Sequence, residues 1–354
     1  MNAEVKTKKR RKEKDNFVVD FEGKSTRWER FKAHYLTPHF LFEVVWAIFR
    51  YVLLIGIAYV IIYPFIAKIA GSFMSKEDFM DITVKLIPRH PTLATYKAII
   101  TENKYFLALW NTTLLSFLCA VIQMVMTMVI GYGFAKFKFR GNTLLFYLVI
   151  FTMIVPHQTL KLAFFTKFRY FDFDALGLIN LFTGKQGIVH LLSGKPMGLN
   201  LINTYWPLGL LSFGGLAFKN GLYIFLMRQF FRGVPDELEE AAYVDGSGVF
   251  KTFVNIIVPL SVPMMITVFL FAFSWQWTDD FYSQMFFTRN TTYLMPNVVS
   301  VPSSLGAEGF TAATVYTSAI TNTCALMIII PLVILYCFCQ RYLVEGIERS
   351  GIVG

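Results

Sequence analysis

Long stretches without a charged residue constrain this chain more than any other feature. Five of six such runs reach the ~20 residues that an α-helix needs to cross the ~30 Å hydrocarbon core of a bilayer. The first run is shorter, but flanks from Val44 to Ala70 extend it. The six runs cover residues 51–67, 105–135, 141–160, 196–218, 252–278 and 311–340. The sequence therefore predicts an all-α integral membrane protein with six transmembrane helices.

The composition excludes a soluble protein of this length. Apolar residues make up 55% of the 354 residues and charged residues only 16%, against about 25% in ordinary globular domains. A soluble chain this apolar would expose large hydrophobic patches and aggregate, so its apolar surface is expected to face lipid. We expect a basic cytoplasmic extension over 1–43, a six-helix transmembrane domain over 44–340 and a cytoplasmic C-terminal tail over 341–354.

Basic residues gather before the first apolar run. The formal net charge is +10, and twelve of the 33 lysines and arginines lie in the first 50 residues. This distribution follows the positive-inside rule, so it predicts a cytoplasmic N-terminus and requires no nucleic-acid partner. Six spans would return the C-terminus to the same side. Segments near 71–104, 161–200 and 289–310 are then expected outside, and segments near 136–140, 228–251 and 341–354 inside.

The four cysteines lie inside or at the edge of the apolar runs. They are Cys119, Cys324, Cys337 and Cys339. Their spacing is not that of metal ligands, and we interpret them as small packing residues. No metal or cofactor is expected.

The internal segment at about 232–258 has the signals of two helices joined by a sharp turn. Pro235 suits the first turn of a helix, and the acidic residues that follow it favour the positive end of the helix dipole. Gly246 can adopt the left-handed conformation that ends a helix, and Ser247 can cap a second one. We expect this second helix to end at Pro259 and Pro263, beside the fifth span.

One face of the predicted first helix is suited to close contact. Leu238, Ala241, Ala242 and Asp245 recur at helical spacing, and the alanines would let another backbone approach. An amphipathic helix lying on lipid headgroups is the alternative. However, the segment between 232 and 251 has five acidic and only two basic residues, so an anionic inner leaflet would repel its net negative charge. The charge therefore favours a protein partner.

This segment resembles a known motif. Glu240-Ala241-Ala242, then Asp245-Gly246, and finally Pro259-Leu260 and Pro263 are similar to the EAA loop of binding-protein-dependent ABC importer permeases. The resemblance implies a coupling helix, between the fourth and fifth spans, that docks into a groove of an ATPase subunit. The residues implied in this docking are Glu240, Ala241, Ala242, Asp245 and Gly246.

Other segments resemble the maltose-type carbohydrate permeases within that family. They are Asn111-Thr112, 131–141, 202–206, 342–346 and 351–354. The first 43 residues and the stretch 172–199 depart from the family as an extension and an insertion. The resemblance implies a permease subunit in the bacterial cell membrane. It would form half of the translocation path for a carbohydrate, specifically an oligosaccharide. The resemblance also implies an ABC ATPase in two copies, a second permease subunit and an extracellular sugar-binding protein as partners, with ATP hydrolysis on the separate ATPase.

Polar and aromatic side chains within the spans are candidates for the substrate path. Such residues are costly in a membrane unless they face protein or water. Trp275 and Gln276 combine an aromatic face with a planar amide, the groups that bind sugars, and Gln158 in the third span is similar. An aromatic belt at the outer interface is the alternative for Trp275. Lys219, a charge at the end of the fourth span, is expected to snorkel or to be paired.

Two other classes of function stay open. The chain could be an ABC permease for a non-sugar solute, or a solute carrier or channel that works without an ATPase. No Gly-rich loop ending in Lys-Ser or Lys-Thr is present in the sequence, so the chain is not expected to bind ATP by that route. The five histidines form no ligand pattern, and we predict no enzymatic activity.

Overall fold

A computed structural model describes residues 38–172, 187–188, 192, 198–289, 292–306 and 313–351. Helices dominate this part of the chain, and an isolated antiparallel bridge joins Phe171 to Leu199. The elements up to residue 213 are α2 (Pro38–Ser72), α3 (Ala94–Glu102), α4 (Tyr105–Lys136), α5 (Asn142–Ile154), η1 (His157–Leu160), α6 (Lys161–Arg169) and α9 (Trp206–Phe213). After these come α10 (Asn220–Arg232), α11 (Glu237–Val244), α12 (Val249–Thr252), the π-helical η3 (Phe253–Ile257), α13 (Val258–Trp277), α14 (Phe281–Phe286), α15 (Met295–Val298), η4 (Ser303–Leu305) and α16 (Ala313–Gly351).

The chain divides into two compact units, residues 1–66 and 67–354. The described part of the first unit belongs to α2, which is apolar on all sides and exposed along most of its length. A helix that is apolar all round is suited to lipid or to a partner helix. The basic residues of the extension up to residue 37, and most of the stretch 172–199, lie outside the described residues.

Four helical segments in the described residues are long and apolar enough to span a membrane: Phe42–Ser72, Tyr105–Lys136, Val249–Trp277 and Ala313–Leu343. A fifth candidate is the pair Asn142–Ile154 and His157–Arg169, which is bent by 93° at its break. The structure therefore supports a multi-pass helical membrane protein. The count of six spans stays a prediction.

The expected fourth span is not a continuous helix. Within 196–218 the structure has the eight-residue α9, followed by a turn; the 13-residue α10 begins at Asn220, beyond this run. Two left-handed residues break the helix, Gly215 at φ +69° and Lys219 at φ +67°. The apolar composition of 196–218 does not reveal these backbone conformations.

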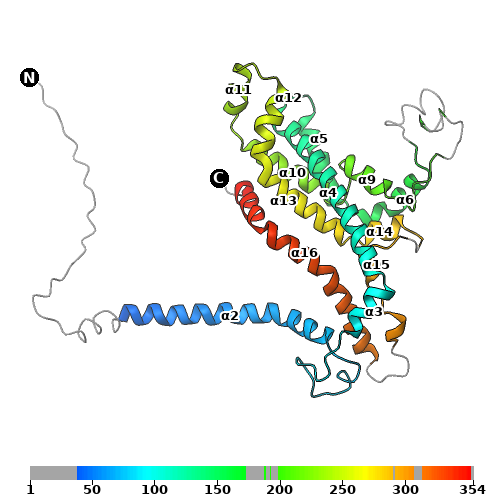
Figure 1. Cartoon of the computed structure of the whole chain (residues 1–354). Coiled ribbons are helices and arrows are strands. Elements are labelled where there is room, and N and C mark those ends of the chain that lie inside the picture. Colours follow the sequence, from blue (N-terminus) through cyan, green and yellow to red (C-terminus); the bar gives the residue numbers. More distant parts are fainter. Residues whose placement is uncertain are drawn as a thin grey trace, which may run out of the picture. The chain divides into compact units, whose positions relative to one another are not determined.

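The core of the larger unit lies where α4 packs against α10 and α13, and α13 packs against α16 (Figure 1). Gly131 lets α4 and α10 approach closely, because a Cβ atom there would lie 2.6 Å from Met227 Cβ. The elements α11 and α12 lie at the Lys136 end of α4, and α3 lies at the Tyr105 end. The packing thus places the predicted coupling segment at one end of the bundle.

The helix that follows α11 was expected to end at Pro259 and Pro263, and the structure shows that it does not. Helical structure runs without a break from Val249 to Trp277. The π-helical η3 changes the hydrogen-bond register, so that Pro259 falls in the first turn of α13, where its missing N–H is tolerated. Likewise, α16 continues as a helix to Gly351, through most of the predicted tail over 341–354.

Candidate functional site

The predicted short helix and its turn are both present. Helix α11 has three glutamates in its first turn, at the positive end of its dipole. Its C-terminus is closed by Gly246 at φ +80°, whose N–H donates to the carbonyl of Tyr243 at 3.0 Å. The N–H of Ser247 donates to the carbonyl of Ala242 at 2.9 Å. These two bonds form a Schellman motif, in which a left-handed residue satisfies the last carbonyls of a helix.

The predicted cap of the second helix is wrong by one residue. Gly248 occupies the N-cap of α12, and no side chain caps this helix. Ser247 instead belongs to the turn, where its backbone closes α11.

Helix α11 has a buried side and an exposed side, and the exposed side does not match the predicted contact face. Glu239 and Ala242 are buried against this chain, at 7% and 6% exposed. Glu240, Ala241 and Asp245 are exposed and remain available to a partner. The expectation that Ala242 lies on the open face is wrong, because the helix uses it to pack on its own chain. The open surface keeps Leu238, Ala241 and Asp245 from the predicted face and adds Glu240.

A group of four residues holds α11 to the end of α4, and we call it the α4–α11 anchor. Its members are Tyr132, Lys136, Asp236 and Glu239. Lys136 Nζ lies 2.5 Å from Asp236 Oδ1 and 3.3 Å from Glu239 Oε1, and it donates to the carbonyl of Val234 at 2.7 Å. The Glu239 contact is an ion pair without hydrogen-bond geometry. Tyr132 donates its hydroxyl to Glu239 Oε2 at 2.8 Å.

The α4–α11 anchor is mostly enclosed. The side chains of Lys136 and Glu239 are only 8% and 10% exposed, whereas that of Asp236 is 78% exposed. The Lys136 ammonium donates to Asp236 and lowers the pKa of that carboxyl. The Tyr132 ring packs against Phe253 with a centroid distance of 4.6 Å. Tyr132 thus touches both α11 and the π-helical η3.

Sequence reasoning missed this group. Lys136 was assigned to a short internal turn, and Glu239 was counted only as one acid among five. A signal was present, because Lys136 directly ends a long charge-free run, 105–135. What could not be read from the sequence is that residues about 100 positions apart meet there.

Two of the proposed path residues lie at the end of α13. The Trp275 side chain is 46% exposed, and its ring lies 5.2 Å from that of Phe218. The Lys219 ammonium sits 5.1 Å from the centroid of the Trp275 ring and 5.0 Å from that of Phe218. The Gln276 amide nitrogen is buried and makes no hydrogen bond in the described part of the chain. Lys219 is therefore held by cation–π contacts.

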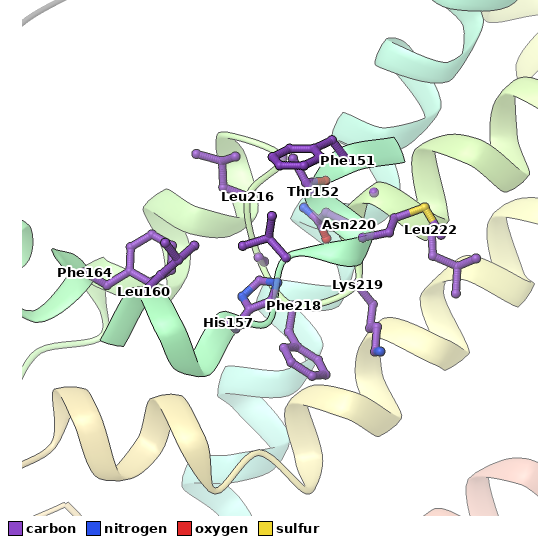
Figure 2. A pocket seen from close by; sticks show the side chains of 15 residues that line it. Phe151, Thr152, His157, Leu160, Phe164, Leu216, Phe218, Lys219, Asn220 and Leu222 are labelled. Carbon is purple, nitrogen blue, oxygen red and sulfur yellow. The ribbon is translucent and has the colours of Figure 1, made fainter. Parts of the chain in front are cut away.

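A cavity of about 380 Å³ adjoins this group, between α5, η1, α6 and the start of α10 (Figure 2). Its lining is mostly apolar and includes Phe218 and Lys219. Asn220 also lines it, fully buried, and neither polar atom of its side chain has a hydrogen-bond partner among the described residues. His157 also lines it, with its ring 5.0 Å from that of Phe218, and contacts the Tyr282 hydroxyl. The cavity therefore has a mostly apolar wall that also carries the polar side chains of Lys219, Asn220 and His157.

Gln158 is not brought to Trp275 and Gln276. It is exposed on η1 and lines a different hollow with Lys161, Phe165 and Gln284. The structure thus groups two of the three proposed path residues. Within the described ranges, no set of His, Cys, Asp and Glu side chains is arranged to hold a metal ion.

Comparison with known proteins identifies the family to which this architecture belongs. Residues 124–349 match the family described as the binding-protein-dependent transport system inner membrane component. This match covers more than half of the chain and includes α11, its turn and α13. The chain belongs to this family. It is a transport subunit of an ABC importer, and ATP is hydrolysed by a separate subunit.

Curated relatives extend the similarity over nearly the whole permease. A maltodextrin transport system permease protein of Streptococcus pneumoniae is 28% identical over 85% of this chain and 93% of its own length. A galactooligosaccharides transport system permease protein of Bacillus subtilis is 25% identical over 87% of this chain and 95% of its own. A solved structure of a bacterial ABC transporter involved in the import of alginate matches with a TM-score of 0.60. It shares 19% identity and covers 85% of this chain and 97% of its own, which shows a common fold.

Proposed function

We propose that this permease forms half of the path by which an ABC importer carries an oligosaccharide across the bacterial cell membrane. The observation that supports this most strongly is the family match over 124–349, read together with the names of the relatives. Three of them are permeases for galactooligosaccharides, maltodextrin and arabinooligosaccharides. The other half of the path would come from a second permease subunit, and an extracellular sugar-binding protein would deliver the substrate.

A non-sugar solute is the second candidate. A permease for osmoprotective compounds in Synechocystis is 24% identical over 85% of this chain. Its similarity is close to that of the oligosaccharide permeases, so the fold alone does not separate the two substrate classes.

An uptake experiment tests the proposed substrate class directly. The permease with its ATPase, second permease and binding protein, reconstituted in vesicles, should take up an oligosaccharide only when ATP is supplied. Maltodextrins, galactooligosaccharides and a small osmolyte form the panel, and labelled uptake is the measurement. Uptake of the osmolyte alone would favour the second candidate, and uptake without ATP would contradict an ABC importer.

In the same assay, Trp275→Ala with Gln276→Ala should raise the substrate concentration for half-maximal uptake, whereas unchanged kinetics would remove both residues from the path.

We further propose that α11 docks in a groove of the ATPase, with two ATPase copies serving the two permease subunits. Its exposed Glu240, Ala241 and Asp245 would form the contact. Gly246 would keep the turn beneath it, and Ala242 would support the helix from its buried side. The acidic open face supports a basic or polar groove rather than an anionic membrane surface.

Both termini are proposed to be cytoplasmic, with six spans between them. In a background without the four native cysteines, Ile82→Cys should react with an impermeant thiol reagent applied outside, and Val244→Cys should react only after the membrane is opened. Both positions suit labelling, because their side chains are 92% and 88% exposed. The opposite pattern would reverse the topology, and reaction of both from one side would contradict an even number of spans between the N-terminus and α11.

A further inference from the structure

The α4–α11 anchor contains a buried charge pair that α4 does not need for its own termination. The C-cap N–H of α4, from Phe137, already donates to the carbonyl of Gly133. A lysine in the last turn of a helix also favours the negative end of the dipole when it is fully exposed. Lys136 is instead 8% exposed and turned into contacts with the segment before and within α11. Its burial therefore requires an explanation beyond helix capping and membrane topology.

The polar contacts of the Lys136 and Tyr132 side chains all lead to α11 or to the residues directly before it. The acceptors of Lys136 are the Val234 carbonyl and Asp236, both directly before α11, and its ion-pair partner Glu239 lies within α11. Tyr132, one helical turn earlier on α4, binds the second oxygen of the same glutamate. Burying a charged pair is unfavourable unless both ions are well paired, and removing one partner leaves the other without compensation. Any displacement of α11 relative to α4 would separate these charges in an enclosed site.

This geometry connects α11 to two long helices by different means. Along the chain, the Gly246 turn leads into the continuous helical segment Val249–Trp277. Through space, the α4–α11 anchor leads into α4, which packs against both α10 and α13. A movement of α11 would therefore act on α4 as well as on the segment that follows it in sequence.

We propose that Lys136 and Glu239 are positioning residues that transmit the movement of α11 to α4 during transport. The proposal rests on the proposed docking of α11 to an ATPase. Neither residue is expected to contact the ATPase, because Glu239 lies on the enclosed side of α11, opposite its open face, and the side chain of Lys136, at the end of α4, is also enclosed. Their loss should accordingly leave subunit assembly intact and reduce the transport obtained per ATP hydrolysed.

The test compares Lys136→Met with Lys138→Met in the reconstituted importer. Both substitutions remove one lysine from the same internal turn, but Lys138 is exposed and makes no ion pair in the described residues. Lys136→Met should retain ATPase co-purification and the binding-protein concentration for half-maximal ATPase stimulation, while transport per ATP falls at least about tenfold. Lys136→Arg should restore much of the coupling because it keeps the charge. Lys138→Met should match the wild type.

Glu239→Gln is the second variant, because it removes the charge and keeps an oxygen that can accept from Tyr132. It should also lower transport per ATP, and Lys136→Met with Glu239→Gln together should be no worse than the poorer single variant, as expected for residues that act as a unit. If Lys136→Met fails to insert, Glu239→Gln and Lys136→Arg decide the question. Loss of ATPase co-purification in these variants would overturn the proposal, because the two residues would then act in docking the ATPase. Unchanged transport per ATP would overturn it as well. Absence of ATP-dependent uptake by the wild type would instead contradict the proposed function.

Discussion

Replacement of Ala241 by tryptophan is expected to abolish ATP-driven uptake while the protein still inserts into the membrane. Ala241 lies on the exposed side of α11, so a large side chain there does not disturb the packing of this chain. In a close-fitting groove it would hold the helix away from the ATPase. Overpacking of a tight contact costs roughly 1–3 kcal/mol, which corresponds to docking weakened by about 5- to 150-fold. Uptake, ATPase co-purification and ATPase stimulation by loaded binding protein should all be lost together.

Ala241→Ser is the control for this prediction, since it changes the same position with almost no increase in volume. It should assemble and transport nearly as the wild type does. Retention of uptake by Ala241→Trp would show that α11 does not enter a close-fitting groove, and the energy of ATP hydrolysis would then have to enter elsewhere.

Gly246→Val is expected to be comparably damaging for a different reason. The φ angle of Gly246 is +80°, and a Cβ atom there would meet nothing within 4 Å. The penalty is therefore purely conformational, about 1–2 kcal/mol for a left-handed residue and more for a β-branched one. Relief of this strain requires the Schellman turn to open, which would release the end of α11. Uptake should fall by about tenfold or more, because each 1.4 kcal/mol corresponds to a factor of ten.

Gly248→Val provides a matched comparison two residues away. Gly248 also has open space around its Cβ position, but its backbone is extended at φ −76° and ψ 163°, a conformation that valine readily adopts. It should keep most of the transport activity. Equal losses at Gly246 and Gly248 would mean that side-chain bulk at the turn, rather than its left-handed backbone, causes the defect.

Local features of this region could be predicted from the sequence because they depend on neighbouring residues. Proline and acidic residues marked the start of α11, and the glycine at its end predicted a left-handed turn that the structure confirms. The long charge-free runs likewise predicted helices at α4, α13 and α16. In each case the information lies within a few residues of the feature itself.

Features that depend on distant contacts were predicted poorly. Periodicity placed Ala242 on the open face, but which side of α11 packs inward is decided by its contact with the rest of the chain. The break between α9 and α10 follows from two backbone conformations that apolar composition does not encode. The α4–α11 anchor requires that residues about 100 positions apart meet, for which one sequence offers no signal.

The candidate path stays a prediction, and the structure shows only how its residues are distributed. Trp275 and Gln276 are adjacent in sequence and remain together at the end of α13, while Gln158 lies at another hollow because η1 turns the chain away after α5. Lys219 was expected to snorkel or to be paired, and the structure shows it over the rings of Phe218 and Trp275. Its left-handed backbone places it there, and that conformation is rare for a residue with a side chain.

The unbroken helical segment from Val249 to Trp277 gives the permease a lever arm. At a rise of ~1.5 Å per residue, its 29 residues span about 43 Å. A rigid rotation of about 10° at the end next to α11 would therefore sweep Trp275 sideways by roughly 7 Å, more than the width of a pyranose ring. The five-residue π turn of η3 lies close to the driven end of this arm, just beyond α12. A change in its hydrogen-bond register there would alter the direction of the arm, so a small change at α11 would be amplified at Trp275.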